Sequence, residues 1–73
     1  MWYLYIIQKK DRYYTGITTN IENRLRQHGN QPLLYIENHE NKFQAAKRER
    51  EIKGWSKLKK EELIAKFNKV SLP

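Results

Sequence analysis

Five side chains spread along the sequence have the chemistry needed to cleave a phosphodiester bond. Tyr5 and Tyr14 lie in two short aromatic segments, Arg24 and His28 follow four residues apart, and Glu49 comes later in an apolar stripe. A guanidinium stabilises negative charge that develops on a phosphoryl group, and a carboxylate binds a hard divalent cation. A phenol or an imidazole can move the proton of the attacking water. The set therefore contains the parts of a metal-assisted phosphodiester-cleaving site.

Glu49 has the most unusual surroundings of the five. It follows Ala45 by four residues and precedes Ile52 by three, so on a helix it points towards the packed side. A glutamate is rarely buried unless another group pairs with it. We interpret it as a ligand for Mg²⁺ or Mn²⁺. The alternative is a boundary glutamate that pairs with Lys53, four positions further on.

The other four residues also have ordinary explanations. Arg24 fits a solvent-exposed helical arginine, and His28 fits an imidazole that interacts with the dipole at a helix C-terminus. Tyrosine is favoured in strands on propensity alone. A phenol titrates near pH 10, so it needs nearby cations or a metal-bound water to accept a proton at neutral pH. Which of Tyr5 and Tyr14 acts as the base is left open.

The composition indicates a small basic protein. The 73 residues include 15 Lys and Arg against eight Asp and Glu, a net charge of +7, and residues 42–69 hold ten basic and four acidic side chains. This excess predicts a nucleic-acid partner, the alternative being a solvated helical face. Without cysteine, disulfides and thiolate zinc sites are excluded. No apolar run reaches the roughly 18 residues of a membrane span, so we expect a soluble cytoplasmic protein without a membrane partner.

The first half of the chain predicts a β-hairpin followed by a helix. Met1–Gln8 and Arg12–Ile17 are rich in aromatic and β-branched residues, and a polar turn separates them. Gly16 indicates a place where another group approaches the backbone closely. Thr19-x-x-Glu22 has the pattern of a capping box, which starts a helix that runs to about His28 and ends at Gly29.

The second half predicts a strand and two helices. Leu33–Glu37 is apolar, Asn41 can cap a helix that ends at Gly54, and Ser56 can cap the last helix. The apolar stripes follow helical spacing and comprise Phe43, Ala45, Ala46 and Ile52 in the first helix, and Leu63, Ile64 and Phe67, with Lys60, in the second. The fold class is therefore α+β, with a small three-stranded sheet flanked by helices in the order β-β-α-β-α-α. Residues 1–73 form one domain.

The order and spacing of these residues resemble the GIY-YIG nuclease superfamily. Tyr3-Leu4-Tyr5 is similar to its first half-motif and Tyr14-Thr15-Gly16 to its second. Arg24 lies ten residues past Tyr14, His28 follows it, and Ala45-x-x-x-Glu49 resembles the helix that presents the metal-binding glutamate. The resemblance covers residues 2–67 and is specifically to short single-domain members related to the nuclease module of bacterial excision-repair proteins.

The resemblance implies a metal-dependent endonuclease that acts on DNA or RNA, with DNA favoured. Tyr5 or Tyr14 would activate water, Arg24 would stabilise the phosphorane, His28 would assist proton transfer or hold phosphate, and Glu49 would bind Mg²⁺ or Mn²⁺. The basic C-terminal helices would hold the nucleic-acid backbone without reading bases, which predicts a steep salt dependence. The expected contacts there are Lys53, Lys57, Lys59 and Lys60.

The sequence also departs from the family pattern. Tyr3 replaces the first glycine, the connection from His28 to Leu33 is short, and an asparagine found after the glutamate helix in some branches has no counterpart. The short connection after His28, together with the lack of an attached targeting domain, favours an alternative: a nucleic-acid-binding module with the same fold and little or no cleavage. A third interpretation is an adaptor domain whose basic face binds an acidic protein. The oligomeric state is left open by the sequence.

Overall fold

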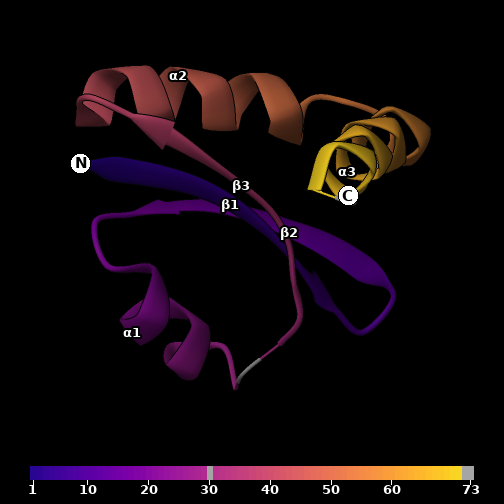
Figure 1. The fold of residues 1–73 in the computed structure, drawn as a ribbon, viewed down its shortest axis with the longest axis horizontal. Helices are drawn as coiled ribbons and strands as arrows, with labels where there is room; N and C mark the ends of the chain where they lie inside the picture. Colours follow the sequence, from indigo (N-terminus) through magenta and orange to yellow (C-terminus); the bar gives the residue numbers. More distant parts are fainter. Residues whose placement is uncertain (30, 72–73) are drawn as a thin grey trace.

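The fold is described from a computed structural model, which covers residues 1–29 and 31–71, with side chains to residue 67. The predicted order of elements, β-β-α-β-α-α, is confirmed (Figure 1). The elements are β1 (Trp2–Lys9), β2 (Arg12–Thr18), α1 (Ile21–Gln27), β3 (Leu33–His39), α2 (Lys42–Lys53) and α3 (Lys57–Ser71).

The three strands form one antiparallel sheet in the order β2-β1-β3, so β1 is central. Because side chains alternate along a strand, Leu4 and Ile6 point to one face of β1, and Tyr5 and Ile7 point to the other. All four are fully buried, so both faces of the central strand are covered. Tyr5 pairs with Gly16 of β2, which places a phenol deep in the sheet beside a residue without a side chain.

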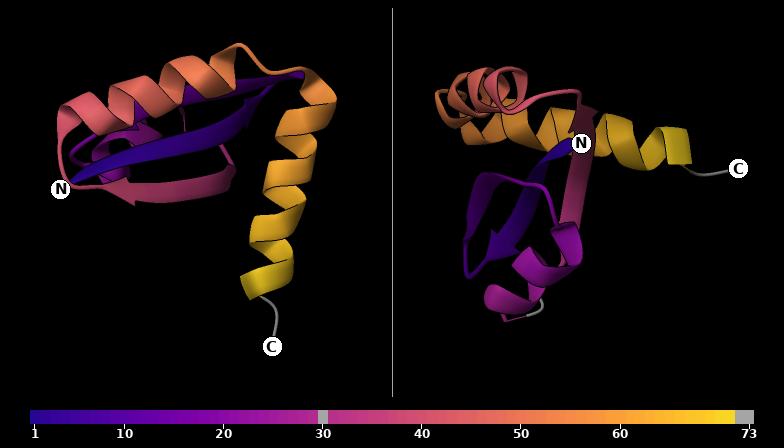
Figure 2. Two further views of the ribbon diagram at one scale, coloured as in Figure 1. Left: turned by 90° about the horizontal axis from the view of Figure 1, so that it is seen from above. Right: turned by 90° about the vertical axis from the view of Figure 1, so that its left-hand side faces the viewer.

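The helices lie on both sides of this sheet. α1 is on one side, and α2 and α3 are on the other, where α3 runs in a different direction from α2 (Figures 1 and 2). The core on the α2–α3 side consists of Leu4, Ile6, Tyr35, Ile52 and Ile64, with Trp55 packed against it. Burying this apolar surface is the main force that holds the two long helices on the sheet.

Side-chain caps fix the starts of the two long helices as expected. The Asn41 side chain accepts a hydrogen bond from the backbone amide of Gln44 at 2.9 Å, and the Ser56 hydroxyl accepts one from Lys59 at 3.2 Å. These bonds satisfy amides that have no partner within the helix. Gly54 ends α2 as predicted. The caps set the position of Glu49 along α2 relative to the sheet.

Two details of the sequence prediction are wrong. The cap of α1 is Asn20, whose side chain accepts from the amide of Asn23, so the Thr19-x-x-Glu22 box does not form. Asparagine is a stronger N-cap than threonine. Phe43 does not belong to the buried stripe of α2, because its side chain is 75% exposed. It precedes Ala45 by two residues, which is roughly 200° around a helix and therefore the opposite side.

The end of α1 is as predicted and sets the place of His28. His28 is the C-cap, and its amide donates to the carbonyl oxygen of Arg24, while the amide of Gly29 donates to that of Arg26. Gly29 follows with a φ of +75°, the left-handed conformation that commonly terminates a helix. The short connection to β3 includes residue 30, which lies outside the described residues. Within the part of the chain that the structure covers, no helix is long and apolar enough to cross a membrane.

Candidate active site

The site is built around a close approach between Tyr5 and Gly16. A Cβ atom added to Gly16 would lie 2.5 Å from the Tyr5 hydroxyl oxygen, which is far inside van der Waals contact. Glycine is therefore required for the ring of Tyr5 to lie across β2, as the sequence indicated. The two half-motifs therefore depend on each other, because Gly16 of the second leaves the space that the Tyr5 ring of the first occupies.

His28 and Tyr14 complete an aromatic cluster with Tyr5. The Tyr5 hydroxyl and the Nε2 atom of His28 are 3.3 Å apart and form a hydrogen bond. The ring centroids of Tyr14 and His28 are 4.8 Å apart, and those of Tyr5 and Tyr14 are 6.4 Å apart. Tyr5 is fully buried, whereas Tyr14 is 40% exposed. The cluster therefore has an inner phenol, an outer phenol and an imidazole that contacts both rings.

Arg24 and Glu49 act electrostatically on the buried phenol. Burial raises the pKa of Tyr5 most strongly, and negative charge on Tyr14 or Glu49 would raise it further. The positive charge of the nearby Arg24 guanidinium lowers that pKa. The net shift is upward, so Tyr5 is protonated at neutral pH. The five predicted site residues therefore converge on one region of the fold.

The imidazole of His28 is held in its neutral form. Burial lowers the pKa of His28, and the positive charges of Lys9 and Arg24 lower it further. Since the ordinary value is 6.5, this ring is uncharged at neutral pH. When Nε2 carries the ring proton and donates it in the hydrogen bond to the Tyr5 oxygen, Nδ1 is the nitrogen that can accept a proton. A neutral imidazole between two phenols and a guanidinium can take up a proton.

Glu49 lies at the boundary between the packed and solvated sides of α2. Its side chain is 21% exposed, as its position in the apolar stripe predicts. It also forms the ion pair given as the alternative, since Lys53 Nζ lies 3.5 Å from its Oε2 atom. Lys53 is 54% exposed, so this pair is weak and easily displaced. Among the described residues, no group of three or more metal-ligating side chains lies together.

The four lysines predicted to contact nucleic acid do not form a single surface. Lys53 pairs with Glu49. Lys57 lies 5.9 Å from the ring centre of Tyr13, and it lines a small pocket together with Lys60. Lys59 lies over Trp55, whose ring is also packed against the core. Only Lys57 and Lys60 therefore face the hairpin that carries Tyr14.

Sequence reasoning missed two features. The sequence pattern predicts only a hairpin turn and its flank at Lys9, Lys10 and Arg12, but these residues line an open pocket beside Tyr14. The available signal was a lysine in a two-residue turn, where glycine or asparagine is usual. The second feature is a network in which the Glu37 carboxylate of β3 bonds to Tyr35, His39 and Arg48. Its residues are far apart in sequence, and no local pattern predicts their contact.

Comparison with known proteins gives consistent matches. The family model of the GIY-YIG catalytic domain matches residues 1–33, which include both phenols, Arg24 and His28 but not Glu49. UPF0213 proteins of Natronomonas pharaonis and Staphylococcus saprophyticus are 38% and 40% identical over 86% of this chain, covering 89% and 93% of those proteins. The solution NMR structure of a Bacillus halodurans UPF0213 protein has a TM-score of 0.64 at 30% identity, covering 89% of this chain and 84% of that one.

Proposed function

The chain belongs to the UPF0213 family, short proteins of the GIY-YIG type, and we propose from this that it is a divalent-metal-dependent endonuclease. It hydrolyses phosphodiester bonds in DNA or RNA, with DNA favoured by the resemblance to excision-repair nucleases. The observation that carries the proposal is the convergence of Tyr5, Tyr14 and His28 on Gly16, with Arg24 and Glu49 in electrostatic reach. An adaptor domain gives no reason for this convergence.

The different exposure of the two phenols supports different roles. Tyr14 is the one that solvent reaches, so it orients the attacking water. His28, neutral at working pH, accepts the proton of that water. Tyr5 is a positioning residue, because its hydroxyl holds His28 Nε2 and fixes which ring nitrogen is free. The raised pKa of Tyr5 is compatible with this role, which requires no phenolate.

Arg24 is assigned to the phosphoryl group. Its guanidinium remains charged throughout the working pH range and presents a planar fork that matches two phosphate oxygens. Charge on phosphorus-bound oxygens increases as water attacks, so a fixed cation beside them stabilises the transition state more than the ground state. The effect of this guanidinium on the pKa of Tyr5 supports the assignment, because it puts the positive charge beside the cluster of phenols.

The residues present fit a hard divalent cation held by few protein groups. Mg²⁺ commonly binds through one or two carboxylates and substrate phosphates while keeping several waters. Glu49 supplies one largely buried carboxylate, and its weak pair with Lys53 leaves it available. A bound cation would act as a Lewis acid and stabilise charge on the leaving 3′ oxygen. Mg²⁺ and Mn²⁺ both suit an oxygen ligand of this kind.

The direct test is a cleavage assay with end-labelled single-stranded, duplex and branched DNA, and with the matching RNAs. Each substrate is incubated with Mg²⁺, Mn²⁺ or EDTA beside Glu49→Ala and Arg24→Ala. Exposed residues of the same charge, Glu40 and Arg50, provide the control variants Glu40→Ala and Arg50→Ala. The proposal predicts cation-dependent cleavage that only the two site variants lose. Cleavage that persists in both site variants identifies a contaminant.

A second candidate is a module that binds nucleic acid without cleaving it. The observation in its favour is the ammonium group of Lys53, which lies 3.5 Å from Glu49 where a cation would bind. Salt-sensitive binding with no cleavage of any substrate in either cation would establish this alternative. Lys53→Met then discriminates further, because removing the competing charge should increase the cleavage rate of a nuclease and leave a pure binding module inactive.

A further inference from the structure

The tip of the β1–β2 hairpin has two open pockets that share three residues. The larger has a volume of about 670 Å³ and runs from Lys9 to Tyr14 along the turn. The smaller, of about 220 Å³, lies between the hairpin and the first turns of α3, where Lys57 and Lys60 line it. Asp11, Arg12 and Tyr13 line both pockets. The two hollows therefore form a continuous surface from the outer phenol of the site to α3.

This surface is strongly basic. We define the hairpin surface by its five cations, which are Lys9, Lys10, Arg12, Lys57 and Lys60. Asp11 is the acid that lines it, and Glu61 lies at its margin, where it accepts a hydrogen bond from Tyr13. Within residues 1–29 and 31–67, none of the five cations forms a salt bridge. Their charges are thus available to a polyanion.

Lys10 occupies a backbone position that suits glycine. Its φ is +58°, a value that is rare for residues with a side chain. It is the first residue of a two-residue turn, and Asp11 does not share the positive φ, a combination in which glycine is strongly preferred. Strained backbone conformations of this type cluster at binding and catalytic sites. The turn therefore holds an ammonium group at the hairpin tip at a cost to folding stability.

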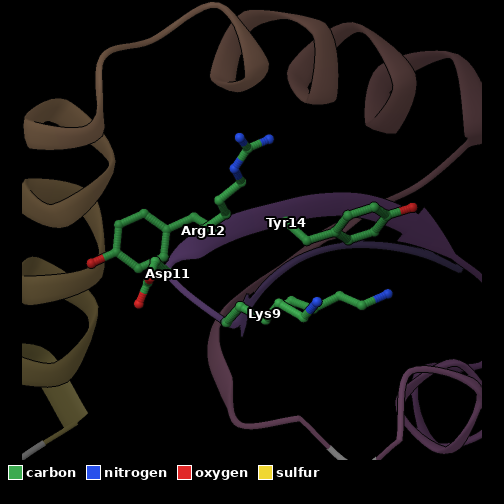
Figure 3. A pocket seen from close by; sticks show the side chains of 6 residues that line it. Lys9, Asp11, Arg12 and Tyr14 are labelled. Atoms are coloured by element: carbon green, nitrogen blue, oxygen red, sulfur yellow. The ribbon is translucent and has the colours of Figure 1, made fainter.

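The larger pocket leads directly into the candidate active site. Tyr14 lines the pocket and its ring contacts that of His28. In Figure 3 the side chains of Lys9 and Tyr14 extend in the same direction from the hairpin, and Arg12 points towards α2. Lys9 is also close enough to His28 to act on its charge. A strand lying in this pocket would therefore bring its next phosphate to Tyr14.

We propose that the hairpin surface holds a single-stranded segment of nucleic acid and leads it to the candidate active site. Cations on long hydrocarbon stems, set around two tyrosine rings, suit the exposed phosphates and bases of a single strand. Duplex DNA presents its phosphates on a convex surface and its bases are already stacked. The inference rests on the proposed function, because it names the surface that delivers the substrate of that centre.

The test measures binding in EDTA, so that cleavage does not interfere. Fluorescence anisotropy is recorded with a labelled single strand and a matched duplex over a range of salt concentrations. The hairpin variant is Lys10→Gly/Arg12→Gln, and the control is Lys47→Gln/Lys66→Gln, which removes two exposed charges elsewhere. We expect the wild type to prefer the single strand. The hairpin variant should bind it about tenfold more weakly than the control, with a salt slope smaller by about 1.4.

Lys10→Gly alone keeps the test independent of folding. Its thermal midpoint should equal or exceed that of the wild type, because glycine relieves the strain, while its affinity falls. Equal affinities of the hairpin and control variants, or a wild-type preference for duplex, overturn the inference. If the wild type cleaves but the two variants bind alike, the hairpin surface is wrong and the nuclease stands. If the variants differ but the wild type cleaves nothing, the hairpin surface stands and the nuclease fails.

Discussion

Two clusters in this protein contain the same four residue types but differ in how tightly their side chains are hydrogen-bonded. The candidate active site has tyrosine, histidine, arginine and glutamate, and so does a network centred on Glu37, beside the α2–α3 core. In that network Tyr35 donates a hydrogen bond to Glu37, His39 Nε2 lies 2.8 Å from the Glu37 carboxylate, and Arg48 Nε lies 3.1 Å from it. Arg48 also reaches Glu51, and its guanidinium lies over a tryptophan ring.

The Glu37 network satisfies its own members. Burial alone would raise the pKa of Glu37, but hydrogen bonds from Tyr35, His39 and Arg48 hold it below its ordinary value. The pKa of Tyr35 is raised to about 12 by burial and by the bond to Glu37, so the phenol stays a donor. A buried polar network of this kind stabilises the fold when every member has a partner. The Glu37 carboxylate at its centre already has three hydrogen-bond partners.

The candidate active site is held more loosely. Its hydrogen bond between Tyr5 and His28 is 3.3 Å long, its ion pair between Glu49 and Lys53 is 3.5 Å long, and Tyr14 is 40% exposed. Residue types alone therefore do not distinguish a catalytic site from a structural network. The unused hydrogen-bonding capacity of the first cluster is what a phosphate and a cation can fill.

The largest predicted effect comes from the two arginines. Arg24→Ala should lower the cleavage rate by about 10²–10³-fold, because it removes the cation that faces the transition state. Arg48→Ala should leave the rate of the folded protein unchanged and lower the free energy of unfolding by about 1–3 kcal/mol, since it leaves Glu37 short of a partner. Single-turnover kinetics and urea titration measure the two quantities. Equal loss of activity in both variants would contradict the distinction.

The two buried phenols provide a second matched pair. Tyr35→Phe should cost about 1.5–3 kcal/mol of unfolding free energy, because it removes a hydrogen bond to a carboxylate. Tyr5→Phe removes only the 3.3 Å bond to His28, so its stability should fall by about 0.5–1.5 kcal/mol while its cleavage rate falls more than that of Tyr35→Phe. Thermal melts beside cleavage assays give both values. A larger loss of stability in Tyr5→Phe than in Tyr35→Phe would contradict the difference in strength between the two hydrogen bonds.

The close approach at Gly16 gives a third prediction. Gly16→Ala places a methyl group 2.5 Å from the present Tyr5 hydroxyl position, so the buried ring must move, at a cost of about 1–3 kcal/mol. The displaced phenol should release His28, and cleavage should fall with it. Gly54→Ala is the control, because its Cβ would lie at an ordinary 3.5 Å from the nearest atom. If the two variants are equally active and stable, Gly16 does not position Tyr5.

The smallest predicted effect concerns pH. Burial and the charges of Lys9 and Arg24 lower the pKa of His28, so its catalytic neutral form should persist below pH 6.5. Activity should fall only as the pH drops through that lowered pKa. The contribution of His28 to folding stability has the same sign: it is present above pH 6.5 and is lost as the pH falls through the lowered pKa. Lys9→Gln should move the acid limb of the kcat profile upwards by less than about one pH unit. An acid limb that does not move, measured at saturating substrate, excludes this electrostatic coupling.

Local signals in the sequence were sufficient for most of the fold. Asn41 and Ser56 cap their helices through bonds to residues three positions away, so they could be predicted without tertiary information. The Thr19-x-x-Glu22 pattern predicts the cap of α1 one residue too early, because Asn20 directly after Thr19 is the stronger N-cap. The apolar character of Phe43 predicts burial, but its angular position on α2 leaves the side chain exposed.

The candidate site was less accessible to sequence reasoning than the fold. The order of Tyr5, Tyr14, Arg24 and His28 identified the set, but not which phenol is buried, because that depends on Tyr5 lying across Gly16 of the next strand. The conformation of the hairpin turn depends on the positive φ of Lys10, which no residue pattern predicts. The Glu37 network joins β3 to α2 across eleven residues, so its hydrogen bonds follow only from the packed structure.

The two glutamates test the central claim most directly. Glu49→Gln and Glu37→Gln each remove one negative charge with little change in shape, and both side chains are about four-fifths buried. Single-turnover cleavage and thermal unfolding are measured on the two variants side by side in Mn²⁺. The account predicts that Glu49→Gln loses cleavage at nearly unchanged stability, and that Glu37→Gln cleaves at the wild-type rate but unfolds at a lower temperature. Cleavage that survives in Glu49→Gln, or that is lost in folded Glu37→Gln, would contradict it.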